Sequence, residues 1–344
     1  MISNLISREE LDKAEQLFND CRNVVITTHT SSDGDAIGSS LALYEYLKSR
    51  GKQVTVIVPN YYPSFLHWMT DADKIIEYDK HKGLAHSFIN GADLICCLDL
   101  NEPSRLSDLS EPIVNARAKK LMIDHHLNCN RFCDVIISYP HASSTSELVF
   151  RLINALGGLK KLTKAGAEDI FAGICTDTGR LSFNSNNPDL FRIIAELIEK
   201  GIDKDKIIRN IYNNYTEGRF RMLGHVLYNK LRVFPEQGAA YYSLSKEEQL
   251  SFNFKKGDAE GLVNMPLEIK GIHFSISLRE DTEKPVIWVS LRSVDDFTVN
   301  DIAARYFNGG GHKNAAGGHL DCSLEEAINL CEKVIKELNP ETIN

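Results

Sequence analysis

Short apolar runs alternate with longer helical patterns in the first half of the chain. The runs occupy residues 24–28, 53–58, 93–98, 119–123 and 134–138. Several of them are apolar without interruption, which is typical of strands that are buried on both faces of a sheet. Between the first two runs, one helical face is formed by Ile37, Leu41, Tyr44 and Leu47. The pattern predicts βαβ units and therefore an α/β fold with a mostly parallel sheet flanked by helices.

The pattern becomes helical after Pro140 and returns to strands in the last third of the chain. Ser144 and Glu147 have the spacing of a capping box, and a helical stripe runs through residues 190–198. Further strands are expected at residues 231–234, 238–244, 272–280 and 286–293. A glycine-rich loop at 309–318 lies between two further helical patterns. We expect an α/β domain over residues 1–212, a connecting helix or linker over 213–228 and a smaller α/β domain over 229–344.

The composition is that of a globular protein. The chain has 344 residues, of which 43% are hydrophobic and 25% are charged, and at about 150 residues per domain this length suggests two domains. With 39 basic and 47 acidic residues, the formal net charge is −8. This charge argues against a general basic surface for long duplex nucleic acid or for an anionic membrane. It leaves room for a locally cationic pocket that binds a small anion.

The start of the chain and its cysteines indicate a cytoplasmic protein. The first twenty residues carry charges throughout, without an apolar run of signal-peptide length, and no stretch reaches the roughly 18 apolar residues of a membrane span. The eight cysteines are scattered and mostly lie in apolar surroundings, as expected of reduced, buried thiols. Cys129 and Cys133 are four residues apart without a matching second pair, so ordinary packing is favoured over a zinc site.

Aspartates and histidines gather where the predicted strands end. In open α/β sheets, ligands bind beyond the carboxyl ends of the strands. Four segments supply such side chains: His29, Asp33 and Asp35 after the first strand, Asp99 after the third, Asp124, His125 and His126 after the fourth, and Asp177 after the helical pattern of residues 165–175. Three of these segments should meet at the same edge of the sheet.

Each position alone has an ordinary explanation. Asp35 precedes a helical pattern and would serve as its N-cap, and a single histidine is more often an exposed or satisfied residue than a ligand. The triplet of Asp124, His125 and His126 is different, because three polar groups beside a core need partners. A metal ion is a partner that satisfies both residue types.

The residue types also indicate the metal and the reaction. Carboxylates and imidazoles without thiolates favour Mn²⁺, Mg²⁺, Fe²⁺ or Zn²⁺, and the predominance of aspartate favours an octahedral ion such as Mn²⁺. With six or more ligands, two divalent ions about 3.5–4 Å apart are more natural than one, and such a pair suits in-line attack at phosphorus. The sequence therefore predicts phosphoester hydrolysis at a centre of two divalent metal ions, with Mn²⁺ preferred.

These residues resemble the motifs of the DHH phosphoesterases, a family named after the triplet seen here at residues 124–126. The family's first motif, His-x-x-x-Asp-x-Asp, matches His29, Asp33 and Asp35; the second matches Asp99; and the fourth, Thr-Asp-Thr-Gly, matches residues 176–179. Residues 309–318, GGGHKNAAGG, look like the signature of the DHH-associated C-terminal domain. Two departures are present: Ser31 and Ser32 replace the usual Asn-Pro, and LDLNEPSR replaces a sequence nearer Asp-Thr-Ser around Asp99.

The resemblance implies a role for each residue of the cluster. His29 and Asp33 would bind one metal ion, Asp35, His125 and Asp177 would bind the other, and Asp99 would bridge the two ions. The catalytic His126 would face the scissile phosphate, and Asp124 would orient an adjacent histidine. A hydroxide that bridges the metals would attack the phosphorus, while the metals and His126 stabilise the developing charge.

The glycine-rich motif offers donors for an anion. Gly309, Gly310 and Gly311 would let backbone N–H groups approach phosphate oxygens, and the donors of His312, Lys313 and Asn314 follow directly. A plain turn between a helix and a strand is the alternative explanation. Together with Arg292 in the preceding strand, the motif predicts a site that grips a terminal phosphate of the substrate across a cleft between the domains. Arg105 is either a further phosphate contact or a surface residue.

The two-domain layout is similar to that of family members that are both oligoribonucleases and 3′-phosphoadenosine 5′-phosphate phosphatases. The resemblance implies hydrolysis of short single-stranded oligoribonucleotides to mononucleotides and of 3′-phosphoadenosine 5′-phosphate to AMP, with neither long duplexes nor membranes as partners. A homodimer is compatible with the sequence. The alternatives are a pyrophosphatase or exopolyphosphatase, a phosphodiesterase for cyclic dinucleotides or their linear products, and a noncatalytic nucleotide sensor.

Overall fold

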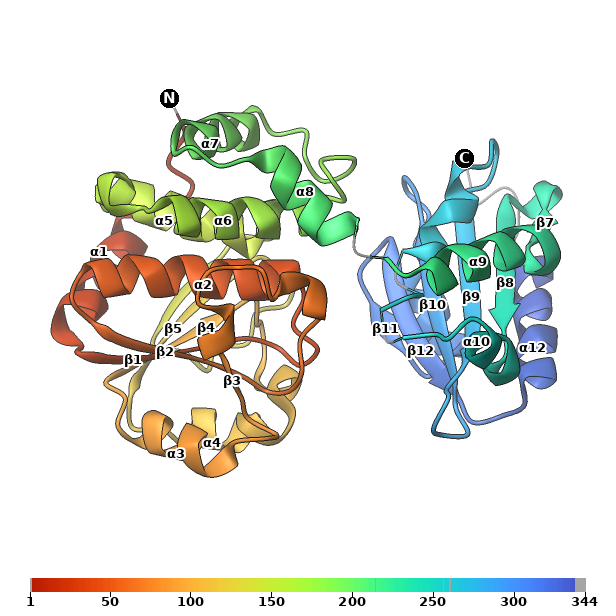
Figure 1. The fold of residues 1–344 in the computed structure, drawn as a ribbon, viewed down its shortest axis with the longest axis horizontal. Coiled ribbons are helices and arrows are strands. Elements are labelled where there is room, and N and C mark those ends of the chain that lie inside the picture. The colour runs from red at the N-terminus through yellow and green to blue at the C-terminus, as the bar shows by residue number, and fades with distance from the viewer. Residues whose placement is uncertain (1, 214, 256, 260, 338–344) are drawn as a thin grey trace. The chain divides into compact units, whose positions relative to one another are not determined.

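The computed structural model describes residues 2–213, 215–255, 257–259 and 261–337. It divides into two compact units, Met1–Asn214 and Tyr215–Asn344 (Figure 1). Each unit has a six-stranded sheet and a hydrophobic core of its own. Within the described ranges, no helix combines the length and the apolar character that crossing a membrane requires.

The sheet of the first unit is parallel throughout, in the order β3-β2-β1-β4-β5-β6. Its strands are β1 (Asn23–Thr27), β2 (Gln53–Val58), β3 (Ile76–Glu77), β4 (Leu94–Leu98), β5 (Lys119–Asp124) and β6 (Val135–Ser138). The five apolar runs of the sequence form every one of these strands except the short edge strand β3. Every residue of the central strand β4 is buried, which confirms the prediction of a parallel sheet covered on both faces.

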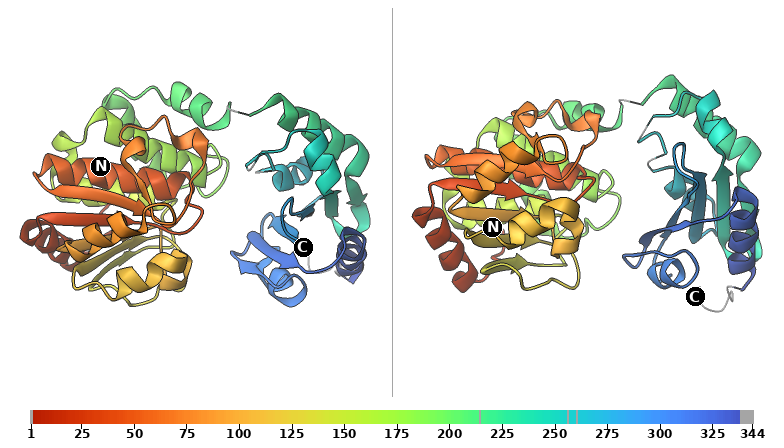
Figure 2. Two further views of the ribbon diagram at one scale, coloured as in Figure 1. Left: turned by 60° about the horizontal axis from the view of Figure 1, so that its bottom comes forward. Right: turned by 90° about the horizontal axis from the view of Figure 1, so that it is seen from below.

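Helices cover both faces of this sheet, as Figures 1 and 2 show. One core contains side chains of α1 (Arg8–Asp20), α2 (Gly34–Ser49), α5 (Thr145–Ala155), α6 (Lys164–Asp177), α7 (Pro188–Glu199) and α8 (Lys204–Tyr212). The core on the opposite face contains side chains of α3 (Lys82–Asn90), α4 (Ser110–Val114) and the 3-10 helix η3 (Pro103–Leu109). The helices thus bury the alternate residues of each strand.

Side-chain caps set the starts of these helices. Ser7 and Glu10 form a reciprocal capping box at α1. Ser144 caps α5 by accepting a hydrogen bond from the N–H of Glu147 at 3.0 Å, at the position that the sequence predicted. The N-cap of α2 is Asp33, and Asp35 lies inside the helix. The N-cap explanation, which was the ordinary alternative to a ligand role for Asp35, therefore does not hold, and its carboxylate has other partners.

The sheet of the second unit is mixed, in the order β11-β12-β10-β9-β8-β7, with β8 and β9 parallel and the other pairs antiparallel. Its strands are β7 (Arg232–Phe234), β8 (Ala239–Leu244), β9 (Phe274–Glu280), β10 (Ile287–Ser293), β11 (Gly310–Gly311) and β12 (Ala315–Leu320). One face packs against α11 (Asn300–Tyr306) and α12 (Leu324–Glu337). The other face packs against α9 (Glu217–His225), next to which α10 (Lys246–Ser251) lies in Figure 1. This smaller α/β unit agrees with the predicted fold class.

Two segments singled out in the sequence contain regular elements of the second unit. The segment 213–228 contains α9, and Met222 of this helix is buried in a cluster with Tyr242 of β8. The glycine-rich loop is a short hairpin, because β11 pairs with β12. A Cβ atom on Gly309 would lie 1.9 Å from the carbonyl oxygen of Gly317. Glycine is therefore required at position 309 by the packing of two backbone segments.

Candidate metal centre

The predicted cluster assembles at the carboxyl ends of β1, β4 and β5 and at the end of α6. Among the described residues, three groups of side chains place their ligand atoms within 4.8 Å of one another: His29, Asp33 and Asp99; Asp35, His125 and Asp177; and Asp99, His125 and His126. Asp99 and His125 each belong to two groups, so the three groups form one continuous centre. The structure brings together every residue that the sequence assigned to metal binding.

Main-chain carbonyl groups orient two of the histidines. Nδ1 of His29 lies 2.8 Å from the carbonyl oxygen of Thr30, and Nδ1 of His125 lies 3.2 Å from that of Ala142. Because a carbonyl oxygen only accepts, Nδ1 carries a proton in both rings, and in the neutral form of each ring Nε2 has the lone pair that can bind a metal. The two Nε2 atoms lie 3.3 Å and 3.6 Å from the carboxylate of Asp99.

Backbone N–H groups hold two of the aspartates. Oδ1 of Asp33 accepts hydrogen bonds from the N–H groups of Asp35 and Ala36, both at 3.0 Å. The carboxylate of Asp35 is fully buried, and its oxygens accept from the N–H groups of Thr145 at 2.6 Å and Ser146 at 2.8 Å. These N–H groups open α5, so the positive end of the helix dipole stabilises the negative charge of Asp35.

Asp99 lies where the groups meet. Its φ angle of 54° is in the left-handed region, which costs a residue other than glycine about 1–3 kcal/mol and is frequent at functional sites. Oδ1 of Asp99 also accepts a hydrogen bond of 3.0 Å from the hydroxyl of Thr145. Thr145 was not among the residues predicted from the sequence. The cap formed by Ser144 was a usable signal, since it marked the start of a helix whose N–H groups attract carboxylates.

Asp124 contacts His126 and belongs to none of the three groups. One of its oxygens lies 2.8 Å from Nδ1 of His126, and the other accepts from the backbone N–H of the same residue at 2.9 Å. Asp124 is fully buried, so both of its oxygens are directed at this one neighbour. Nδ1 of His126 is also 3.5 Å from Asp99. The contact corresponds to the orienting role expected of Asp124.

The carboxylates raise the pKa of the two oriented histidines. Burial lowers the pKa of His29, but the hydrogen bond to Asp99 and the charge of Asp33 outweigh burial and raise the pKa to about 8. Burial also lowers the pKa of His125, and here the hydrogen bond to Asp177 and the charges of the surrounding aspartates raise it to about 11. Both imidazoles are drawn towards the cationic form because several buried carboxylates surround them.

The pKa values of the carboxylates are shifted in opposite directions. Burial, followed by the charges of Asp99 and Asp177, raises the pKa of Asp35 well above its usual range. Burial also raises the pKa of Asp177, to about 6, although its hydrogen bond with His125 acts against the shift. At Asp99 burial is outweighed by the hydrogen bond and charge of His29, and the pKa falls well below its usual range.

The donor set fits divalent cations. The three groups offer carboxylate oxygens and imidazole nitrogens without any thiolate, the mixture that Mn²⁺, Mg²⁺, Fe²⁺ and Zn²⁺ accept. Asp35 and Asp99 are 0% and 2% exposed, and buried like charges in one cluster cost free energy unless positive charge offsets them. A divalent cation held by the imidazole nitrogens and carboxylates of these groups would supply that charge.

Arg105 and Asn101 lie beside this centre. The carbonyl oxygen of Arg105 accepts from the N–H of Thr30 at 2.8 Å. Nη1 of Arg105 lies 3.4 Å from Oδ1 of Asn101. The Asn101 amide donates to the carbonyl oxygen of Leu127 at 2.9 Å. The segment that departs from the family pattern after Asp99 is therefore tied to the loop that follows His126.

The residues predicted to bind phosphate lie close together in the second unit. Arg292 of β10 is paired in register with Ala315 of β12, next to the turn of the hairpin. Lys313 forms an ion pair of 2.5 Å with Asp296. The Asn314 amide donates to the hydroxyl of Ser293 at 2.9 Å and to the carbonyl oxygen of Phe297 at 3.1 Å, so this side chain holds the loop of residues 293–297. His312 is exposed at the end of β11.

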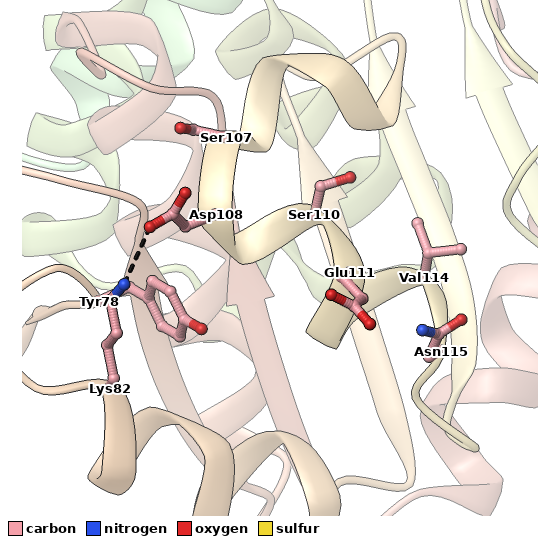
Figure 3. Close-up of a pocket in the computed structure, with 8 residues that line it drawn as sticks. All are labelled: Tyr78, Lys82, Ser107, Asp108, Ser110, Glu111, Val114 and Asn115. Atoms are coloured by element: carbon pink, nitrogen blue, oxygen red, sulfur yellow. Dashed lines mark hydrogen bonds and ion pairs between the residues drawn. The ribbon is translucent and has the colours of Figure 1, made fainter.

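A hollow of about 550 Å³ lies elsewhere in the first unit (Figure 3). It is lined by Tyr78, Lys82, Ser107, Asp108, Ser110, Glu111, Val114 and Asn115. Lys82 and Asp108 form an ion pair of 2.9 Å at its edge. None of the residues in the three ligand groups lines this hollow, so it is separate from the candidate metal centre.

The parallel sheet, the smaller mixed sheet and the carboxylate–histidine centre at the strand ends define a two-domain enzyme of the metal-dependent phosphoesterase class. The chain belongs to the DHH family. The family model described as "DHH family, N-terminal domain" matches residues 23–174, and that of the DHHA1 domain matches residues 237–337. This confirms the resemblance that the sequence motifs indicated.

Three proteins illustrate the similarity. The crystal structure of an exopolyphosphatase-related protein from Bacteroides fragilis is 47% identical and superposes with a TM-score of 0.97 over 100% of both chains. A protein from Thermus thermophilus is 28% identical over 91% of this chain and 89% of its own length, and one from Bacillus subtilis is 28% identical over 95% and 99%. Both of the latter are named bifunctional oligoribonuclease and PAP phosphatase NrnA.

Proposed function

We propose that this chain hydrolyses short oligoribonucleotides to mononucleotides and 3′-phosphoadenosine 5′-phosphate to AMP. The enzyme would use two bound Mn²⁺ ions and would act in the cytoplasm. The observation that carries the proposal is the adjoining set of ligand groups that share Asp99 and His125. The names of the Thermus and Bacillus relatives, which match over most of the chain, support this choice of substrates. Residues 1–212 would form the catalytic domain and residues 229–344 the substrate-binding domain.

The ligand groups suggest how the ions would be shared. His29 and Asp33 would hold one ion, Asp35, His125 and Asp177 the other, and Asp99 would contact both. Bound divalent cations would supply a hydroxide nucleophile at neutral pH and would offset the charge that develops on the phosphate.

The chain's own residues would prepare the reaction. The carbonyl groups that accept from Nδ1 of His29 and His125 would leave Nε2 of each ring available to the cations. Asp124 holds Nδ1 of His126, and the ring of His126 would interact with the scissile phosphate.

The second unit would recognise the end of the substrate. The guanidinium of Arg292 would contact the phosphate, and its Nη1 also donates to the carbonyl oxygen of Leu291 at 2.9 Å. The backbone of Gly309, Gly310 and Gly311 and the side chain of His312 would add donors, whereas Lys313 and Asn314 would contribute mainly by shaping the hairpin, given their contacts with Asp296 and Ser293. In the first unit, Arg105 would be a further phosphate contact.

The test is Mn²⁺-dependent hydrolysis of a diadenylate by Asp99→Ala and His125→Ala. Removal of a residue that orients a metal ligand typically lowers activity by about 10- to 100-fold. We expect each of these two variants to lose more activity than that. Asp108→Ala is the matched control, because it removes an exposed carboxylate outside the centre. Full activity of either ligand variant would refute the metal assignment. Turnover of pyrophosphate but of neither the dinucleotide nor 3′-phosphoadenosine 5′-phosphate would refute the substrate assignment.

A further inference from the structure

The loop that follows Asp177, a residue of the candidate metal centre, holds an exposed phenyl ring. Phe183 is 55% exposed, and its ring packs directly on the backbone of Gly179, where a Cβ atom would lie 2.2 Å from the ring. Gly179 is two residues from Asp177, a separation of at most about 7 Å along the chain. The ring is therefore held on the backbone two residues after a candidate ligand, with much of its surface facing solvent.

A second contact fixes the loop from another side. The amide of Asn184 donates to the carbonyl oxygen of Ser143 at 3.5 Å, and the neighbouring carbonyl oxygen of Ala142 lies 3.2 Å from Nδ1 of His125. The residue next to Phe183 is thus linked to the segment that orients His125. Phe183 is bracketed by two parts of the chain that each carry or hold a candidate ligand.

The loop reaches this conformation at a cost in free energy. Arg180, Leu181 and Asn184 have φ angles of 62°, 66° and 48°, and each such left-handed residue costs about 1–3 kcal/mol when it is not glycine. The N–H groups of Arg180 and Phe183 nevertheless bond to the carbonyl oxygens of Cys175 at 2.9 Å and Thr178 at 3.2 Å. Strain of this kind is frequent at functional sites, and a ligand that covers the ring would remove its exposed apolar surface from water.

We propose that Phe183 is a stacking site for a nucleobase of the substrate whose phosphate lies at the metal centre. This inference rests on the proposed function and extends it, because it assigns the group that distinguishes a nucleotide from pyrophosphate or polyphosphate. Every base has a flat face that stacks on an aromatic ring, and such stacking is worth about 1–3 kcal/mol per base. At 1.4 kcal/mol per factor of ten, the site would strengthen nucleotide binding by roughly 5- to 150-fold.

The first experiment compares a ligand with a base and a ligand without one. In the Mn²⁺-loaded enzyme, Phe183→Ala should weaken inhibition by AMP by roughly 5- to 150-fold and leave inhibition by inorganic phosphate unchanged. Phe183→Tyr keeps the flat face and should resemble the wild type, whereas Phe183→Leu keeps apolar bulk and should resemble Phe183→Ala. Phe88→Ala is the control, since it removes a phenyl ring that is 41% exposed on α3. Equal weakening of AMP and phosphate, or no change for either, would overturn the stacking site.

A second readout does not depend on turnover. In Phe183→Trp the new indole should be quenched by AMP and not by inorganic phosphate, against the background of Trp68 and Trp288 in the wild type. If the wild type hydrolyses diadenylate but Phe183→Ala binds AMP as Phe88→Ala does, the stacking site is refuted and the proposed function stands. If AMP quenches the indole but no nucleotide is hydrolysed, the stacking site stands and the proposed function is refuted.

Discussion

Asp169 of α6 is a buried carboxylate outside the metal centre. The side chain is 1% exposed, and neither oxygen has a hydrogen-bond partner among the described residues. Burial, followed by the charges of Glu45, Glu168 and Asp71, raises its pKa well above the usual range. Because the pKa is higher in the folded state than in the unfolded state, the folded state keeps its proton to a higher pH. The residue therefore lowers the stability of the protein increasingly as the pH rises above the unfolded pKa of about 3.9.

Asp169→Asn should stabilise the protein at high pH. The amide removes the ionisable group with little change in volume, so the gain in melting temperature over the wild type should be small at pH 4 and should grow at pH 8. Thermal unfolding of both proteins across this range, followed by circular dichroism, measures the difference. A gain that is equal at both pH values would show that ionisation of Asp169 is not the cause.

Thr145 is a second residue whose substitution should affect the metal centre, because it contacts two of the candidate ligands. Its N–H binds Asp35 and its hydroxyl binds Asp99. Thr145→Val keeps the first contact and the side-chain shape but removes the second, so we expect Mn²⁺ affinity or activity to fall by about 10- to 100-fold. Thr145→Ser, which keeps the hydroxyl, should recover most of the loss in a Mn²⁺ titration. Equal losses in the two variants would show that the hydroxyl is not the specific cause, and a larger loss in Thr145→Ser would indicate a packing effect of the methyl group.

At the scale of elements, the sequence predicted those features that depend on local pattern. Continuous apolar runs placed β1, β2, β4, β5 and β6, and the ends of three of these strands located most of the candidate ligands. The sequence could not predict which residues contact the ligands, because the contact between Thr145 and Asp99 joins residues that are 46 positions apart. The exposed ring of Phe183 was equally invisible, since an apolar residue in a polar stretch gives no periodic signal.

The glycines of the hairpin show the same limit of prediction from sequence within one motif. In sequence they are equivalent, and a phosphate-binding role was the natural interpretation. In the structure a Cβ atom on Gly309 would lie 1.9 Å from a carbonyl oxygen, whereas a Cβ atom on Gly310 would meet nothing within 4 Å. The first glycine is required by packing, and the second is exposed and has room for a side chain.

Gly309→Ala and Gly310→Ala therefore form a matched pair. Gly309→Ala must push β11 away from β12, and we expect it to lower the free energy of unfolding by about 1–3 kcal/mol, the usual range for a steric change in a packed segment. Gly310→Ala should leave stability within about 0.5 kcal/mol of the wild type. Urea unfolding compares the two. If Gly310→Ala also weakens hydrolysis of 3′-phosphoadenosine 5′-phosphate while remaining stable, that loss would support a ligand contact at its backbone.

At the scale of the whole molecule, the net charge of −8 and the separate hydrophobic cores of the two units together predict how metal binding affects stability. Asp33, Asp35, Asp99 and Asp177 all lie in the first unit, at one centre, and a cation there would offset part of the acidic excess. The apolar clusters that contain the two sheets have no residues in common. Metal binding should therefore stabilise the unit that holds the ligands, and only that unit directly.

Calorimetry of the full chain tests this coupling. A ligand that binds only the folded state stabilises it by about 2.7 kcal/mol at a hundred times its dissociation constant, so Mn²⁺ should raise the melting temperature of the transition of the first unit. Asp177→Asn should remove most of that shift, because it takes one oxygen from a group of three ligands. Gly309→Ala should lower the other transition and leave the Mn²⁺ shift intact. If Mn²⁺ raised both transitions equally in every variant, the cores would be coupled or the ion would bind outside the centre, and the assignment of separate roles to the two units would fail.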